Sequence, residues 1–158
     1  MLRVFITGYG IVSAFGKSWN EFRNALLKKQ NAVIYMQEWE KYKQLTTYLA
    51  APILDYKHPK EWSRKELRSL GRVSQYSVEA AGLALRMAGL FNDSSIKDGR
   101  MGVASGSSTG STDAILELAK LMFAGEGDCN ANSYIKSMPH TTAANIAIFY
   151  GLKGRMIP

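Results

Sequence analysis

Cysteine and histidine are scarce in this chain of 158 residues, which contains one cysteine and two histidines. A single cysteine cannot form an intrachain disulfide, and His58 and His140 are too far apart to suggest a metal site. Cys129 stands beside Asp128 and near Glu126, and these acidic neighbours oppose formation of a reactive thiolate. We therefore interpret Cys129 as inert, and we expect neither a metal nor a cofactor.

Long apolar runs are also missing. No stretch approaches the roughly 18 residues that a membrane span requires. The apolar segment Val4–Thr7 begins too close to Met1 for a signal peptide. We therefore expect a cytoplasmic protein with no membrane span, and its hydrophobic content of 46% is ordinary for a globular core.

Acidic residues are fewer than basic ones, 13 against 20, so the formal net charge is +7. The excess is concentrated in one segment that also holds Glu61 and Glu66. Its basic residues are Lys57, Lys60, Arg64, Lys65, Arg68 and Arg72. Lys65 and Arg68 are one helical turn apart and would project together. The segment is either a solvated helix face or a patch that steers an acidic partner, and the composition alone leaves both open.

Strand signals occur at four places in the chain. Residues 3–7 are apolar and rich in β-formers, which predicts a buried central strand. Residues 101–104 predict a second short buried strand, and residues 49–54 predict a short strand or ribbon. Residues 151–158 have the pattern of a turn followed by the first residues of a new apolar strand. The polar segment 125–134 predicts a loop.

Helix signals alternate with these strands. Ser18 and Glu21 form a capping-box pattern, which predicts a helix that begins after Ser18. Apolar residues at helical spacing predict further helices over 72–87, from 112 onward, and from about 140 to Tyr150. The alternation predicts an α/β fold with a largely buried sheet.

Two glycine-containing segments invite a ligand-binding interpretation. Gly8-Tyr9-Gly10 follows a predicted strand, but Ser13 stands where a dinucleotide fingerprint needs its third glycine. A tight turn is the better interpretation of that segment. The small-residue loop 105–111 precedes a helix, and it could bind an anion through its N–H groups. It could equally line a narrow pocket or approach another subunit, and both possibilities remain open.

Six segments occur together in a recognisable order and spacing. They are Arg3–Gly16, Ser63–Arg68, Gly71–Ser74, Arg100–Val103, Met138–His140 and Tyr150–Gly154. Together they resemble the N-terminal part of a β-ketoacyl–acyl-carrier-protein synthase of the elongating, thiolase-fold kind. The resemblance implies a mixed sheet flanked by helices, of which residues 1–158 would form an incomplete N-terminal half. Residues 29–63 would be a surface excursion within it.

The family's reaction is the decarboxylative Claisen condensation of an acyl thioester with malonyl carrier protein, in fatty acid, polyene or polyketide biosynthesis. The resemblance implies a nucleophilic cysteine and two histidines. Cys129, His58 and His140 match none of these positions, so we expect the catalytic residues after Pro158 and predict that residues 1–158 alone are inactive. Some relatives lack the cysteine and serve as a non-catalytic chain-length-factor-type subunit of a heterodimer, which is the alternative.

Other roles are implied at five positions. Lys65 and Arg68 match positions that contact the acidic acyl carrier protein. Thr109 and Met138 match positions of the acyl pocket near the dimer interface, and His140 falls near the same wall. The resemblance therefore implies an acyl carrier protein and a second ketosynthase subunit, identical or different, as partners. It implies no nucleic acid.

Overall fold

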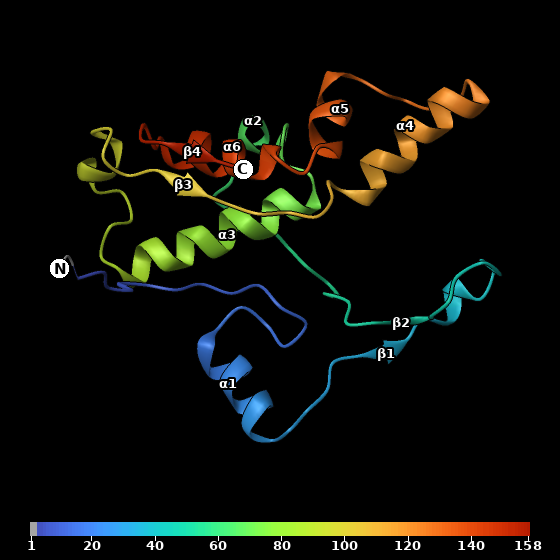
Figure 1. The fold of residues 1–158 in the computed structure, drawn as a ribbon, viewed down its shortest axis with the longest axis horizontal. Coiled ribbons are helices and arrows are strands. Elements are labelled where there is room, and N and C mark those ends of the chain that lie inside the picture. Colours follow the sequence, from blue (N-terminus) through green and yellow to red (C-terminus); the bar gives the residue numbers. More distant parts are fainter. Residues whose placement is uncertain (1–2) are drawn as a thin grey trace. The chain divides into compact units, whose positions relative to one another are not determined.

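A computed structural model of the chain describes residues 3–158 (Figure 1). These residues separate into two units. One consists of the segment up to Tyr9 together with His58–Pro158, and the other is Gly10–Lys57. The proposed excursion of residues 29–63 stays a prediction.

The smaller unit, Gly10–Lys57, contains one α-helix, one 3-10 helix and one strand pair. Helix α1, Trp19–Leu27, begins after Ser18, whose side chain accepts a hydrogen bond from the Glu21 amide in a complete capping box, as predicted. Strand β1, Ile34–Tyr35, pairs antiparallel with β2, Leu49–Ala50. The two strands flank the 3-10 helix Gln37–Trp39. The predicted strand at 49–54 is therefore confirmed for its first two residues.

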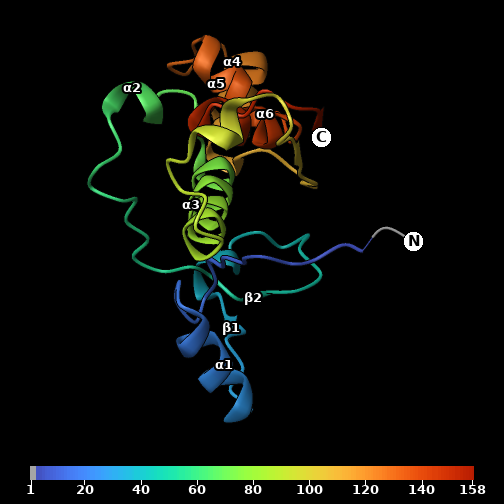
Figure 2. The same ribbon diagram turned by 90° about the vertical axis from the view of Figure 1, so that its left-hand side faces the viewer.

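The larger unit is built around two helices that lie side by side, α3 (Arg72–Met87) and α6 (Thr141–Tyr150), as Figure 2 shows. Both agree closely with the predicted bounds. Their contact is close because Gly82 has no side chain, and a Cβ there would overlap the Tyr150 hydroxyl. That hydroxyl donates a hydrogen bond of 2.7 Å to the Val78 carbonyl. The buried core cluster consists of Leu70, Val78, Ile96, Ile146 and Tyr150.

A short parallel strand pair packs against α6. Strand β3, Val103–Ala104, pairs with β4, Met156–Ile157, so that Val103 lies opposite Met156. The connection between the two strands contains α4 (Thr112–Ala124), α5 (Ala131–Ser137) and α6. Parallel strands joined through helices are the basic unit of α/β proteins. The predicted α/β class is confirmed, as are the strands expected within 101–104 and after Gly154.

Two predicted elements are wrong. Residues 3–7 belong to no strand, and Val4 and Ile6 are 94% and 91% exposed. An apolar run becomes a strand only beside a partner, and the named strands within residues 3–158 pair only as β1–β2 and β3–β4. The predicted loop 125–134 is also too long, because α5 begins at Ala131. Asn130 caps that helix by accepting hydrogen bonds from the amides of Asn132 and Ser133.

Candidate functional site

Within the basic segment, residues Arg64–Leu67 form a short helix, α2. Ser63 caps its N-terminus, where the Glu66 carboxylate accepts hydrogen bonds from both the Ser63 amide and the Ser63 hydroxyl, each at 2.7 Å. These hydrogen bonds, that of the Ser63 hydroxyl first, lower the pKa of Glu66. The one acidic side chain of the helix is therefore held at its N-terminus, where the helix dipole favours it.

Lys65 and Arg68 both have exposed side chains, and the Arg68 amide donates a long hydrogen bond of 3.4 Å to the Lys65 carbonyl. They therefore lie on one turn, as predicted from their spacing. Within residues 3–158, neither makes an ion pair. Arg64 is exposed beside them. The result is a positively charged turn open to solvent, which suits recognition of an acidic surface.

The three residues proposed for a pocket wall lie on two neighbouring segments. Thr109 is exposed in the loop before α4, and its carbonyl accepts a hydrogen bond of 2.7 Å from the Ser107 hydroxyl. Met138 is half-buried at the end of α5. The two segments meet because the Ser111 amide donates to the Lys136 carbonyl at 2.9 Å.

His140 is exposed at the N-terminus of α6, two residues from Met138. Its side chain makes no capping hydrogen bond. The turn between α5 and α6 is held instead by Thr141, whose hydroxyl lies 2.7 Å from the Met138 carbonyl and 3.0 Å from that of Ile135. The position of His140 near a pocket wall stays a prediction.

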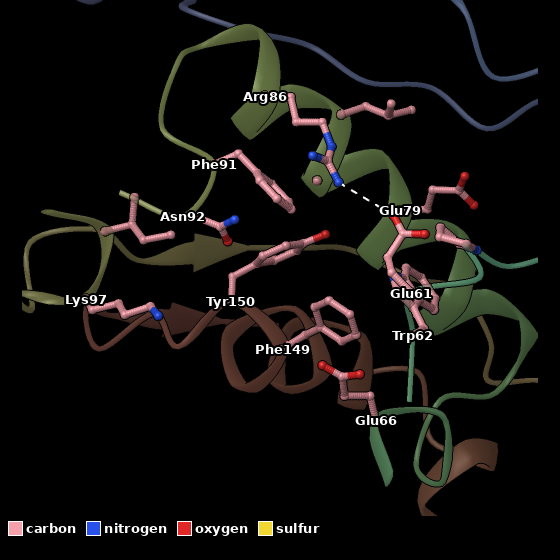
Figure 3. Close-up of a pocket in the computed structure, with 14 residues that line it drawn as sticks. Glu61, Trp62, Glu66, Glu79, Arg86, Phe91, Asn92, Lys97, Phe149 and Tyr150 are labelled. Carbon is pink, nitrogen blue, oxygen red and sulfur yellow. Dashed lines mark ion pairs between the residues drawn. The ribbon is translucent and has the colours of Figure 1, made fainter. Parts of the chain in front are cut away.

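A groove of about 480 Å³ lies elsewhere in the same unit, between α3, α6 and the two segments around residues 59–66 and 91–97 (Figure 3). Its aromatic side chains are Trp62, Phe91, Phe149 and Tyr150. The guanidinium of Arg86 lies 3.5 Å from the centre of the Phe91 ring and 3.8 Å from the Glu61 carboxylate. Glu66, Glu79 and Lys97 complete its charged lining.

The groove combines aromatic rings inclined to one another with charged side chains of both signs, which suits binding and packing. Sequence reasoning did not find it. Trp62 and Phe149 have ring centres 4.9 Å apart although 87 positions separate them in the chain. A pattern of neighbouring residues in the sequence cannot predict a contact between side chains so far apart in the chain.

Tyr150 has the clearest electrostatic perturbation in this groove. The side chain is only 9% exposed, and burial raises the pKa of its phenol from 10.0 to about 12, an effect that Arg86 opposes and Glu79 reinforces. The folded protein therefore holds the phenolic proton more tightly than the unfolded chain does. The resulting stability is complete below pH 10.0 and is lost as the pH rises through about 12.

Tyr150→Phe should remove this part of the alkaline loss of stability. We expect the free energy of unfolding of the variant to fall less steeply between pH 10.0 and about 12 than that of the unchanged protein. Urea unfolding at several pH values measures the two slopes, and the two proteins differ only in the Tyr150 hydroxyl. Equal slopes would contradict the burial of the phenol.

Three further observations concern the described residues. Within residues 3–158, no group of three or more histidine, cysteine and acidic side chains is placed to hold a metal ion. No helix in that part of the chain is long and apolar enough to cross a membrane. Cys129 is half-buried with a free thiol between α4 and α5.

Comparison with known proteins gives one consistent result. The family profile described as the β-ketoacyl synthase N-terminal domain matches residues 1–158. The crystal structure of a β-ketoacyl synthase from Burkholderia phymatum STM815 is 48% identical, with a TM-score of 0.92 over 100% of this chain and 39% of that one. The 3-oxoacyl-[acyl-carrier-protein] synthase 2 of Vibrio harveyi is 26% identical over 154 residues, 96% of this chain.

A more distant structure shares the fold. The ishigamide ketosynthase/chain length factor has a TM-score of 0.74 and 20% identity, over 96% of this chain and 38% of that one. The chain spans 36% of the length of the curated Vibrio harveyi relative. The fold is therefore that of the N-terminal half of thiolase-like ketosynthases, and the chain belongs to the β-ketoacyl synthase family, whose N-terminal domain it forms.

Proposed function

We propose that this chain is the N-terminal part of a β-ketoacyl-acyl-carrier-protein synthase, an acyltransferase. The reaction is the decarboxylative Claisen condensation of an acyl thioester with malonyl carrier protein, in fatty acid, polyene or polyketide biosynthesis. The observation that carries the proposal is the 48% identity, over the entire chain, to a β-ketoacyl synthase of known structure.

Within this function, residues 1–158 supply binding surfaces rather than the reacting groups. Cys129 follows an acidic residue in the α4–α5 connection and is no candidate nucleophile. We place the nucleophilic cysteine and its two histidines outside residues 1–158, so these residues alone have no condensing activity. No cofactor takes part, because the acyl group passes from thioester to thiol without redox chemistry.

The proposed partners are an acyl carrier protein and a second ketosynthase subunit. Lys65 and Arg68 form the docking surface for an acidic acyl carrier protein, supported by their exposure on one turn of α2. Thr109, Met138 and His140 contribute to an acyl pocket that a second ketosynthase subunit completes, supported by the contact between their two segments. We further propose a cytoplasmic location and a homodimer or heterodimer.

The alternative is a chain-length-factor-type subunit that lacks the nucleophile and pairs with an active synthase. The residues described here suit both roles, because docking and pocket surfaces are needed in each. A single experiment distinguishes them. The protein as its gene encodes it is incubated with octanoyl carrier protein, and its cysteines are examined by mass spectrometry.

An octanoyl thioester on a cysteine other than Cys129, followed by release of carbon dioxide on addition of malonyl carrier protein, is the expected result. Absence of the adduct, with activity appearing only on addition of a second ketosynthase subunit, would favour the alternative. An adduct on Cys129 would contradict the assignment of the nucleophile.

A further inference from the structure

Helix α2 is too short to hold its own conformation. It spans four residues, Arg64–Leu67, whereas isolated helices need about 12–15 residues to be stable in water. Leu67 and Leu70 pack into the core cluster and keep the segment folded against the protein. Apolar packing is non-directional, so the direction in which the helix presents Lys65 and Arg68 needs further contacts.

One such contact precedes the helix. The Trp62 ring lies 4.9 Å from the Phe149 ring of α6, with the two planes tilted by 55°. The His58 ring also stacks on Trp62, with ring centres 6.2 Å apart and an angle of 5° between the planes. Aromatic pairs of this geometry have preferred orientations and contribute beyond their buried area. The chain entering α2 is thus fixed to α6.

The other contact follows the helix. The Ser69 hydroxyl donates to Asn145 Oδ1 at 3.2 Å, and Asn145 Nδ2 donates to the Ser74 hydroxyl at 3.0 Å and to the Ser69 carbonyl at 3.5 Å. Asn145 is 5% exposed, so these hydrogen bonds lie where water competes little. The chain leaving α2 is thus fixed to α6 and to the first turn of α3.

The contacts before and after α2 are made by the same face of α6. Asn145 and Phe149 are four residues apart in α6 and therefore lie on one face of that helix. Between α2 and α6 remains a hollow of about 340 Å³, lined in part by Lys65, Asn145 and Phe149. The helix therefore does not fill the space beside α6, and the contacts at its two flanks determine its orientation.

We infer that Asn145 and Phe149 are positioning residues that clamp both flanks of α2 and so orient Lys65 and Arg68 toward an acidic carrier protein. The inference rests on the proposed function, because docking at Lys65 and Arg68 is part of it. The clamp consists of two contacts of α6. Asn145 contacts Ser69, which follows α2, and Phe149 contacts Trp62, which precedes it.

The test uses the protein as its gene encodes it, with octanoyl carrier protein as the probe. Ser69→Ala removes one hydrogen bond of the clamp and leaves the bond between Asn145 and Ser74 in place. Phe149→Leu removes the ring contact at the other flank. We expect each variant to raise the Kd for the carrier by roughly three- to tenfold, while turnover of the carrier-free thioester octanoyl-N-acetylcysteamine stays unchanged.

Two controls accompany these variants. Ser69→Thr keeps the hydroxyl and should bind the carrier as the unchanged protein does. Ser77→Ala removes a hydroxyl that donates at 3.0 Å to the Val73 carbonyl within α3 and takes no part in the hydrogen bonds of the clamp, so it should leave the Kd unchanged. If Ser69 had a merely structural role, Ser69→Ala would instead lower the turnover of octanoyl carrier protein and of octanoyl-N-acetylcysteamine together.

The outcomes separate the clamp from the docking surface. If Lys65→Glu with Arg68→Glu weakens carrier binding but Ser69→Ala and Phe149→Leu do not, the clamp is wrong and the docking surface stands. If the double charge reversal has no effect either, the proposed docking surface fails together with the clamp.

Discussion

Gly110→Ala is expected to destabilise the folded protein by about 2–4 kcal/mol. A Cβ at this position would overlap the carbonyl group of Ser137, and it would lie 2.8 Å from the Lys136 carbonyl oxygen. Both neighbours are backbone atoms, so relief requires a shift of the α5–α6 turn or of the loop before α4. The adjacent Ser111 is 2% exposed and accepts a hydrogen bond of 3.3 Å from the Val73 amide, which holds the loop in place.

Thermal unfolding measures the effect, and a loss of this size corresponds to a fall in Tm of roughly 5–15 °C. Gly106→Ala is the matched control, because no atom lies within 4 Å of its added Cβ. We expect Gly106→Ala to change stability by less than about 0.5 kcal/mol. Equal Tm values for the two variants would show that the contact between Gly110 and Ser137 is absent in solution.

The same contact bears on the proposed pocket wall. Thr109 precedes Gly110 and Met138 follows Ser137, so the close backbone approach sets the distance between these two candidate residues. A close backbone approach is observed at the C-terminal end of loop 105–111, and it tests neither interpretation that the sequence left open for that loop. The approach here is to a segment of the same chain.

Helices marked by apolar periodicity were predictable from the sequence. The glycines after α3 and α6 also predict where these two helices end. Helix α3 ends as its sequence indicates, with Gly89 in the left-handed region at φ +70°. Helix α6 ends at Gly151 with φ +68° for the same reason. Helix α5 was not predicted, because its polar composition hides any apolar face and only the capping side chain of Asn130 marks its start.

Features that depend on distant segments were not predictable from the residues alone. Val4 and Ile6 have the composition of a buried strand, yet burial depends on neighbouring strands that local sequence does not specify. The aromatic groove and the clamp on α2 both join the segment around residues 59–69 to α6. By contrast, the exposure of Lys65 and Arg68 followed from charge and spacing, which are local properties.

Reversing both charges of the docking turn, Lys65→Glu with Arg68→Glu, is expected to raise the Kd for octanoyl carrier protein by roughly 10- to 100-fold at low salt. Both side chains are exposed and adjacent, so an acidic partner would meet two repulsive charges in place of two attractive ones. The affinity of the unchanged protein should fall as salt is added, because salt screens exposed charges. The affinity of the variant should depend far less on salt.

Lys41→Glu with Lys43→Glu is the matched control, because it makes the same change in net charge at two exposed lysines of the smaller unit. If long-range attraction by the protein's overall charge of +7 caused the binding, this control would weaken it as much. We expect it to change the Kd less than threefold, because a specific interface depends on its own charges rather than on the net charge of the protein. A control as damaging as the docking variant would assign carrier binding to net charge, and α2 would then be an ordinary solvated helix.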